Sequence, residues 1–155
     1  MARGPGAKQM RSAARLFATQ ALFQMEAADG DLGEVQREFE THRLGAEIDG
    51  AAYAEADLDL FRALLTGAVD RQARIDQLTD KALVAKWPIA RIDPTLRALF
   101  RAAGAELLTQ TTPPKVAISE FVDVAKAFFP DGKEPKLVNA VLDHMARDLR
   151  PEAFA

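Results

Sequence analysis

Residues 113–143, PPKVAISEFVDVAKAFFPDGKEPKLVNAVLD, decide the fold, because they hold two helical patterns separated by a short turn. Apolar residues recur at three- and four-residue steps in both halves, which places them on one side of a helix with 3.6 residues per turn. The expected inward residues are Ile118, Phe121, Val122, Ala125, Phe128 and Phe129 in the first helix, and Leu137, Val138, Val141, Leu142 and Met145 in the second.

The turn between these two helices is Pro130-Asp131-Gly132. Proline stops the first helix, while aspartate and glycine tolerate turn geometry. Pro135 suits the first turn of the second helix, where its missing N–H has no partner to lose. Because the connection is short, we expect the two helices to pack as antiparallel neighbours.

The N-terminal part of the chain carries another clear helical stripe from about Lys8. Its inward residues are Ala14, Phe17, Ala18, Ala21, Leu22 and Met25, with Lys8 and Arg15 flanking them. Leu16 and Phe23, seven residues apart, fall on the opposite side. They are either solvent-exposed hydrophobic residues, which are common, or part of a protein-binding surface.

Four further helical patterns lie between these segments. The expected inward residues are Leu32, Val35, Gln36 and Phe39 in the second helix, Leu58, Phe61, Leu65, Ala68 and Val69 in the third, Ile75, Leu78, Ala82 and Leu83 in the fourth, and Leu96, Leu99, Phe100, Ala103 and Leu107 in the fifth. Gly67 indicates close approach of another helix, and Trp87-Pro88 ends the fourth helix. Asp93-Pro94 predicts the start of the fifth, with an N-cap acid before a first-turn proline.

The sequence predicts a loop at residues 45–50, and no alternating strand pattern of useful length appears anywhere. We therefore expect an all-α fold of about seven helices. At 155 residues the chain has the size of one domain, able to bury roughly 70% of the surface that its unfolded form exposes. We expect a disordered arm at residues 1–7, one helical domain at residues 8–150 and a short tail at residues 151–155.

Composition points to the cytoplasm. The chain has no cysteine, which excludes disulfides and thiolate metal sites and is typical of a reducing compartment. No apolar run approaches the roughly 18 residues of a membrane span, and the N-terminus lacks the apolar segment of a secretory signal. We expect a cytoplasmic protein without membrane association.

The net charge is only −3, but the charges are unevenly distributed. Residues 1–25 contain four basic residues and no acid, whereas residues 26–60 contain eleven acids and two basic residues. A basic end joined to an acidic segment indicates two surfaces with different partners.

The sequence predicts no catalytic residue, metal site or cofactor. His42 and His144 lie far apart in the sequence, and neither has a second histidine at helical metal-ligand spacing. None of the nine glycines falls in a phosphate-binding pattern, and no serine sits in a glycine-flanked nucleophile turn. We do not expect an enzyme.

Binding to single-stranded RNA is the function that the basic end favours, because RNA attracts cations through counterion release. Lys8, Arg11 and Arg15 occupy one to two turns of a single helix and could follow a few phosphates. So few contacts predict modest, salt-sensitive affinity, and hence the need for a second protein.

The stretch quoted above, together with RSAARLFATQALFQME at residues 11–26, resembles the NusB family of bacterial transcription antitermination factors. The similarity covers residues 11–149. It implies two small helical bundles packed crosswise, and binding to the boxA element of nascent transcripts as a heterodimer with a small-subunit ribosomal protein, called NusE in this context. It also implies a role with the transcription elongation complex in antitermination and ribosomal RNA transcription.

The resemblance also implies which residues bind. The RNA-binding set is Lys8, Arg11, Arg15, Lys115, Lys133, Lys136 and Leu137, and the set that meets the ribosomal protein is Leu16, Gln20, Phe23 and Glu26. Phe23 replaces the usual tyrosine, and Leu137 replaces the usual phenylalanine, which removes a π face for base stacking. Ser119 occupies a position where the family usually has asparagine, and Phe129 one where it usually has glycine. Lys133 occupies a position that is often acidic in the family.

Two alternatives are of a different class. One is a helical protein–protein interaction domain that ignores RNA even with the ribosomal protein present. The other is a regulatory module related to the N-terminal domain of ribosomal RNA cytosine methyltransferases, which would require a catalytic domain with a reactive cysteine; this sequence contains no cysteine.

Overall fold

The structure, a computed structural model, describes residues 6–42, 47–48, 51–52, 56–83, 91–109 and 111–154. The helices in these residues are α1 (Ala7–Ala28), α2 (Leu32–His42), α3 (Leu58–Asp70), α4 (Gln72–Ala82), α5 (Pro94–Thr109), α6 (Pro114–Phe128) and α7 (Glu134–Leu149), followed by a C-terminal 3₁₀ turn (Pro151–Phe154). The all-α class is confirmed. One small addition was not expected: β1 (Glu47–Ile48) pairs antiparallel with β2 (Ala51–Ala52) where a loop was predicted.

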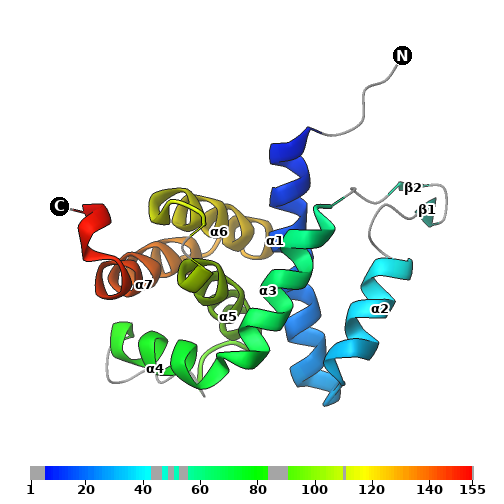
Figure 1. Cartoon of the computed structure of the whole chain (residues 1–155), viewed down its shortest axis with the longest axis horizontal. Coiled ribbons are helices and arrows are strands. Elements are labelled where there is room, and N and C mark those ends of the chain that lie inside the picture. The colour runs from blue at the N-terminus through cyan, green and yellow to red at the C-terminus, as the bar shows by residue number, and fades with distance from the viewer. Residues whose placement is uncertain are drawn as a thin grey trace.

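The helices form two groups that cross each other. α1, α2 and α3 make one group, and α4 to α7 lie across it (Figure 1). α5 occupies the centre, in contact with α1, α3, α4, α6 and α7. α6 and α7 pack against each other on either side of their short turn, as expected. Among the described helices, none is long and apolar enough to cross a membrane.

Local chemistry explains several helix starts. The Asp93 carboxylate accepts a hydrogen bond from the Thr95 N–H at 2.7 Å, and α5 begins at Pro94 between them, as predicted. Asp57 caps α3 in the same way through the Leu60 N–H at 3.0 Å. α7 has a proline in its first turn, as expected. α1 begins at Ala7, inside the expected arm; residues 1–5 and the Trp87-Pro88 stop lie outside the described residues.

The core lies where the helical stripes predicted it, and most of the expected inward residues are buried. The largest fully buried side chains are Phe39, Phe61, Phe100, Phe121, Leu64, Leu65, Ile75, Leu99, Leu107, Leu142, Met145 and Glu106. Three predictions are wrong: Leu58, Val69 and Leu137 are 40%, 37% and 37% exposed. Leu58 and Val69 lie at the edge of the buried stripe of α3, which consists of Phe61, Leu64, Leu65 and Ala68. Leu137 faces a surface cleft in the first turns of α7.

Two glycines allow helices to approach closely. A Cβ atom at Gly67 would lie 3.2 Å from the Cβ of Ala105, so α3 and α5 meet tightly there, as predicted for this glycine. A Cβ at Gly104 would lie only 2.5 Å from the Cγ2 of Ile75, whose side chain is completely buried. Close packing of α4 on α5 therefore depends on the missing side chain at residue 104.

We expect Gly104→Ala to destabilise the protein. Alanine gains up to about 1 kcal/mol of helix propensity over glycine, but overpacking a filled core costs about 1–3 kcal/mol. Urea denaturation should show a lower free energy of unfolding than in the unmodified protein. Gly67→Ala, with its wider contact, is the control and should lose less. A stabilised Gly104→Ala variant would show that Ile75 moves aside freely.

Candidate functional site

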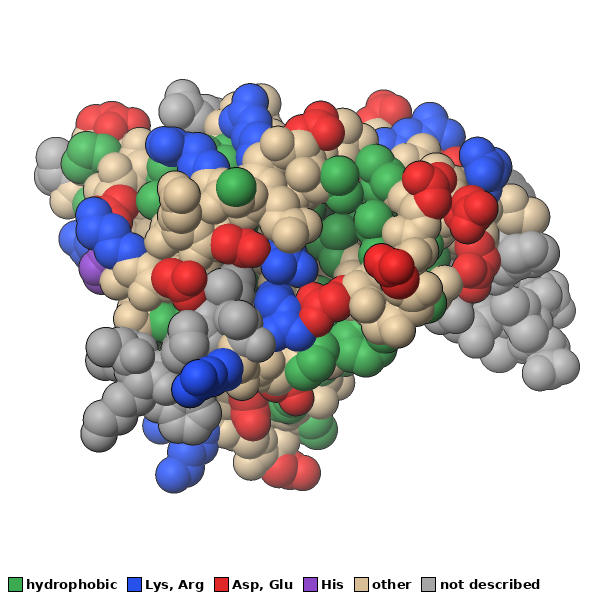
Figure 2. Space-filling view, turned by 90° about the horizontal axis from the view of Figure 1, so that it is seen from below, with side chains coloured by type: hydrophobic (Ala, Val, Ile, Leu, Met, Phe, Trp, Pro, Cys, Tyr) green, Lys and Arg blue, Asp and Glu red, His purple; other side chains and the backbone are tan. Residues whose placement is uncertain are grey.

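A groove runs along the last turns of α1. It has a volume of about 440 Å³ and is lined by Thr19, Gln20, Phe23, Gln24, Ala27 and Ala28 of α1, Phe39 of α2, Thr95 of α5 and Phe128 of α6. Phe23 is 40% exposed, and Gln20 is half-buried beside it. Figure 2 looks at the end of the molecule where α1 ends and shows apolar side chains gathered in a hollow, with acidic side chains beside them. The structure thus brings together Gln20 and Phe23 of the predicted partner-binding set.

Leu16 lies apart from this groove. It is half-buried against the core and lines a second hollow of about 250 Å³ between α1 and α6, with Ala13 and Val124 among its neighbours. Leu16 and Phe23 share one side of α1 but face different hollows.

Glu26, the last predicted partner-binding residue, is engaged within the protein. Arg97 of α5 donates hydrogen bonds to both its carboxylate oxygens, one of them at 2.8 Å. The Nη1 of Arg101 lies 3.1 Å from the same carboxylate, while its Nη2 lies 2.9 Å from Asp76 of α4. Hydrogen bonding from Arg97 lowers the pKa of Glu26 against the opposing effect of partial burial. This cluster ties the end of α1 to α5 and α4.

Arg97 and Arg101 could not be predicted from the sequence as partners of Glu26. They lie four residues apart on α5, beside its inward stripe, and their carboxylate partners stand far away in the sequence. No local pattern signals such pairs, because only the folded chain brings the charges together.

Most of the predicted RNA-binding cations are exposed. Lys8 and Arg11 stand on the first turns of α1, and neither forms an ion pair with a carboxylate in the described part of the chain. Lys115 is exposed at the start of α6, and Lys133 and Lys136 are exposed at the start of α7. Because α6 and α7 are antiparallel, Lys115 lies at the opposite end of the pair from the other two, roughly 20 Å away at 1.5 Å per helical residue.

The start of α7 borders an apolar cleft of about 480 Å³. Leu83, Ile92, Leu96, Phe129 and Leu137 form its apolar lining, and Arg91, Asp93, Lys133 and Glu134 supply its charges. The structure therefore brings Leu137 and Lys133 together, as predicted for this patch, and adds Arg91. Arg91 was missed because it stands outside every helical stripe.

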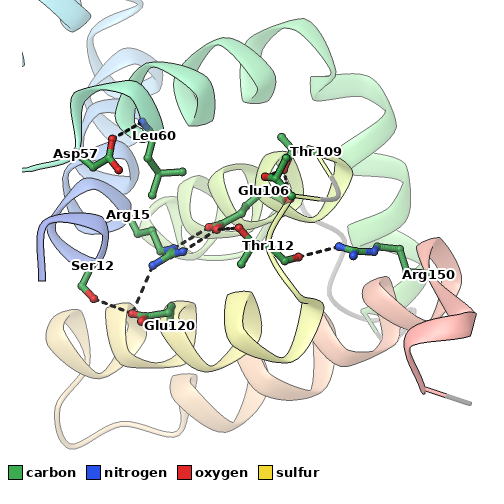
Figure 3. Close-up of polar contacts among 10 residues, drawn as sticks. Ser12, Arg15, Asp57, Leu60, Glu106, Thr109, Thr112, Glu120 and Arg150 are labelled. Carbon is green, nitrogen blue, oxygen red and sulfur yellow. Dashed lines mark hydrogen bonds and ion pairs between the residues drawn. The ribbon is translucent and has the colours of Figure 1, made fainter. Parts of the chain in front are cut away.

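Arg15 corrects the prediction of an outward cationic face. Its side chain is only 3% exposed, and its Nε and Nη2 donate to the two carboxylate oxygens of Glu106 at 2.8 and 2.7 Å (Figure 3). Its Nη1 lies 3.7 Å from Glu120 of α6. The expectation that Arg15 lies on the RNA-facing surface is wrong, because α5 presents a buried carboxylate to it.

The Arg15–Glu106 pair belongs to a longer network. Glu106 also accepts a hydrogen bond from the Thr112 hydroxyl at 2.7 Å, and the Thr112 carbonyl accepts one from Arg150 at 2.9 Å. Burial works against the positive charge of Arg15, but the hydrogen bonds and charge of Glu106 outweigh it and raise the pKa of the guanidinium. The network joins α1, α5, the start of α6 and the end of α7 (Figure 3).

Among the described residues, no group of three or more histidine, cysteine, aspartate or glutamate side chains could hold a metal ion. His144 is exposed and lies 3.7 Å from Asp148. The side chain of His42 lies outside what the structure describes.

Comparison with known proteins agrees with the motifs and the geometry. Residues 12–147 match the model of the NusB family. The chain belongs to the NusB family. Transcription antitermination protein NusB of Mesorhizobium japonicum is 51% identical over 143 residues, 92% of each chain. The protein of the same name from Brucella anthropi is 47% identical over 150 residues, 96% of this chain and 89% of the relative. The family resemblance is therefore confirmed, and the relatives are named for transcription antitermination.

Solved structures of this family share the fold. A structure of T. maritima NusB superposes with a TM-score of 0.74 at 28% identity, covering 98% of this chain and 99% of that one. A crystal structure of antitermination factors NusB and NusE in complex with dsRNA superposes with a TM-score of 0.67, covering 88% of this chain and 96% of that one. At 24% identity, the second structure shows a common fold only.

We expect Arg15→Met to lower the free energy of unfolding by about 3–5 kcal/mol, because it leaves the Glu106 charge buried and unpaired. The double variant Arg15→Met/Glu106→Leu should recover most of that loss. Arg62→Ala, which breaks an ion pair with Glu40 on the surface, is the control and should cost much less, because water screens an exposed pair. Denaturant unfolding measures all three. A single variant no weaker than the control would contradict a structural role for Arg15.

Proposed function

We propose that this chain binds boxA-like single-stranded RNA together with the small-subunit ribosomal protein NusE, and that the complex supports antitermination and ribosomal RNA transcription within the elongation complex. A protein of the same fold has been solved with NusE and dsRNA, and family membership makes the same classes of partner the natural ones to test here. The observation that carries the proposal is that α1 keeps two surfaces open: cations at its start and the Phe23 groove near its end.

The RNA surface in this proposal starts with Lys8 and Arg11 and continues to the exposed lysines Lys115, Lys133 and Lys136. Arg15 has no part in it, because Glu106 already holds the guanidinium. Leu137 contributes apolar surface at the cleft beside Lys133. With cations at separate places, no single cluster would bind RNA strongly, which fits a protein that needs a partner.

The NusE surface in this proposal centres on Phe23 and Gln20. An aromatic side chain that is 40% exposed at the edge of a groove is well placed to anchor a protein partner. Leu16 lies seven residues before Phe23 on the same side of α1, and it extends this surface toward α6. Glu26 keeps about a third of its side chain exposed, and its pairing with Arg97 and Arg101 holds the end of α1 in place.

The experiment that tests the proposal measures RNA binding by fluorescence anisotropy, with this chain alone, with purified NusE alone and with both. Single-stranded boxA-like RNA, a scrambled strand and the matching duplex should be compared at two salt concentrations. We expect tight binding to single-stranded boxA-like RNA only with both proteins, weakening as salt rises. Equal binding by NusE alone would contradict the proposal, and so would a preference for the duplex.

We expect the double variant Lys8→Ala/Arg11→Ala to weaken RNA binding for every sequence tested. Each lost phosphate contact should reduce the slope of log affinity against log salt by about 0.7, so the pair should reduce it by about 1.4. Lys81→Ala, which removes a lysine paired with Asp148, is the control and should leave the slope unchanged. An unchanged slope in the double variant would remove the start of α1 from the RNA surface.

We expect Phe23→Asp to weaken NusE binding by about 30-fold or more, the usual effect of losing a central aromatic anchor. Isothermal titration calorimetry measures the affinity, and far-ultraviolet circular dichroism should show unchanged helix content. Leu58→Asp is the matched control, because Leu58 has the same exposed fraction as Phe23 but lies at the start of α3. Equal losses in both variants would mean that the Phe23 groove is not the NusE site.

A further inference from the structure

The C-terminal 3₁₀ turn places the aromatic ring of Phe154 close to two cations. The Arg147 guanidinium carbon lies 4.5 Å from the centre of the Phe154 ring, and the Lys115 Nζ lies 5.8 Å from it. Arg147 belongs to the last turn of α7, and Lys115 belongs to the first turn of α6. In Figure 1 the turn stands at the end of the α6–α7 pair where α6 begins.

Hydrogen bonds that Arg150 donates and accepts hold this turn in position without the ring. The Arg150 N–H donates to the Ala146 carbonyl at 2.8 Å, and the Ala153 N–H donates to the Arg150 carbonyl at 3.0 Å. The Arg150 side chain donates to the Thr112 carbonyl at 2.9 Å, which links the turn to the loop before α6. The position of Phe154 beside α6 is therefore fixed by the turn, and its side chain is only partly buried.

A groove of about 380 Å³ opens next to the ring, between α6 and α7. Its lining includes Lys115, Ser119, Lys126, Asn139, Arg147 and Phe154. The two carboxylates of the groove already face cations, because Asp143 accepts from Arg147 at 2.8 Å and Asp123 lies 3.9 Å from Lys126. Lys115 has no carboxylate partner among the residues that the structure describes. An additional anion is therefore favoured at Lys115.

We propose that Phe154 stacks on a base of single-stranded RNA, in a site that it forms with Lys115 and Arg147 at this groove. The inference rests on the RNA binding proposed above and adds a residue that neither the motifs nor the family match assigns. Bases stack on aromatic faces, and the phosphates that flank a stacked base pair with cations a few ångströms away. An acidic peptide would also pair with Lys115, but its carboxylates would not need the aromatic face of Phe154.

The position of this site complements the other end of the α6–α7 pair. Leu137 stands there beside an apolar cleft and offers no π face to a base. Phe154 provides one at the opposite end, next to Lys115. A strand that follows the pair would thus meet cations at both ends, and it would meet the Phe154 ring at the Lys115 end.

Substitutions of Phe154 test the proposal in the complex of the full chain with NusE. We expect Phe154→Ala and Phe154→Leu to weaken binding of a single-stranded boxA-like RNA by about fivefold or more, the lower end of the range for one stacked base. Phe154→Tyr keeps the π face and should bind within about twofold of the unmodified chain. NusE affinity and the thermal midpoint of unfolding serve as controls for folding.

Three outcomes would overturn the proposal. If Phe154→Leu binds RNA as the unmodified chain does, the ring acts only by packing. If Phe154→Ala binds more tightly, the ring covers the groove. If all Phe154 variants bind normally while Lys8→Ala/Arg11→Ala binds weakly, RNA binding stands but this site does not.

A direct readout separates the site from the wider function. RNA carrying 5-iodouridine should photo-crosslink to the C-terminal peptide that contains Phe154, and cross-linking should fall in Phe154→Leu. RNA binding with no such cross-link at any position of the label would overturn the stacking site alone. If the unmodified complex does not bind RNA at all, the proposed function fails as well.

Discussion

The packing of this protein depends on one buried ion pair, between Arg15 of α1 and Glu106 of α5. Removing either charge from water costs several kcal/mol unless the opposite charge meets it with good hydrogen-bond geometry. The two hydrogen bonds at 2.8 and 2.7 Å meet that condition. Sliding α1 along α5 would break both hydrogen bonds and leave two buried charges unpaired, so the pair disfavours other arrangements of the two crossing groups of helices.

That register also decides where the proposed binding surfaces lie. With Arg15 directed inward, Lys8 and Arg11 remain exposed at the start of α1, and Phe23 reaches the groove near its end. Arg97 and Arg101 hold the end of α1 through Glu26. Buried or bridged charges thus hold α1 at its middle and its end, and two surfaces for different partners are displayed on one rigid element.

The sequence predicted the fold well because apolar periodicity reports which side of a helix is buried, and the motifs at both ends of the chain identified the family. The same periodicity could not place Arg15. An arginine beside an apolar stripe gives the same sequence pattern whether its side chain faces water or a buried carboxylate. Its partner Glu106 stands 91 residues further along the chain. The β1–β2 hairpin was missed because two-residue strands are shorter than any alternating pattern that can be recognised.

Cations alone do not explain how such a protein would distinguish one RNA from another. Contacts to phosphates fix the position of a strand, whereas contacts to bases carry sequence information. Neither Lys8 nor Arg11 lines any of the four grooves and clefts described above, so in our proposal they hold the strand without contacting its bases. Base contacts then fall to the two ends of the α6–α7 pair: the Leu137 cleft, which can select bases by shape, and the Phe154 ring, which any base can stack on. Sequence preference in this chain would therefore come mainly from the Leu137 end, and the Phe154 end would add affinity.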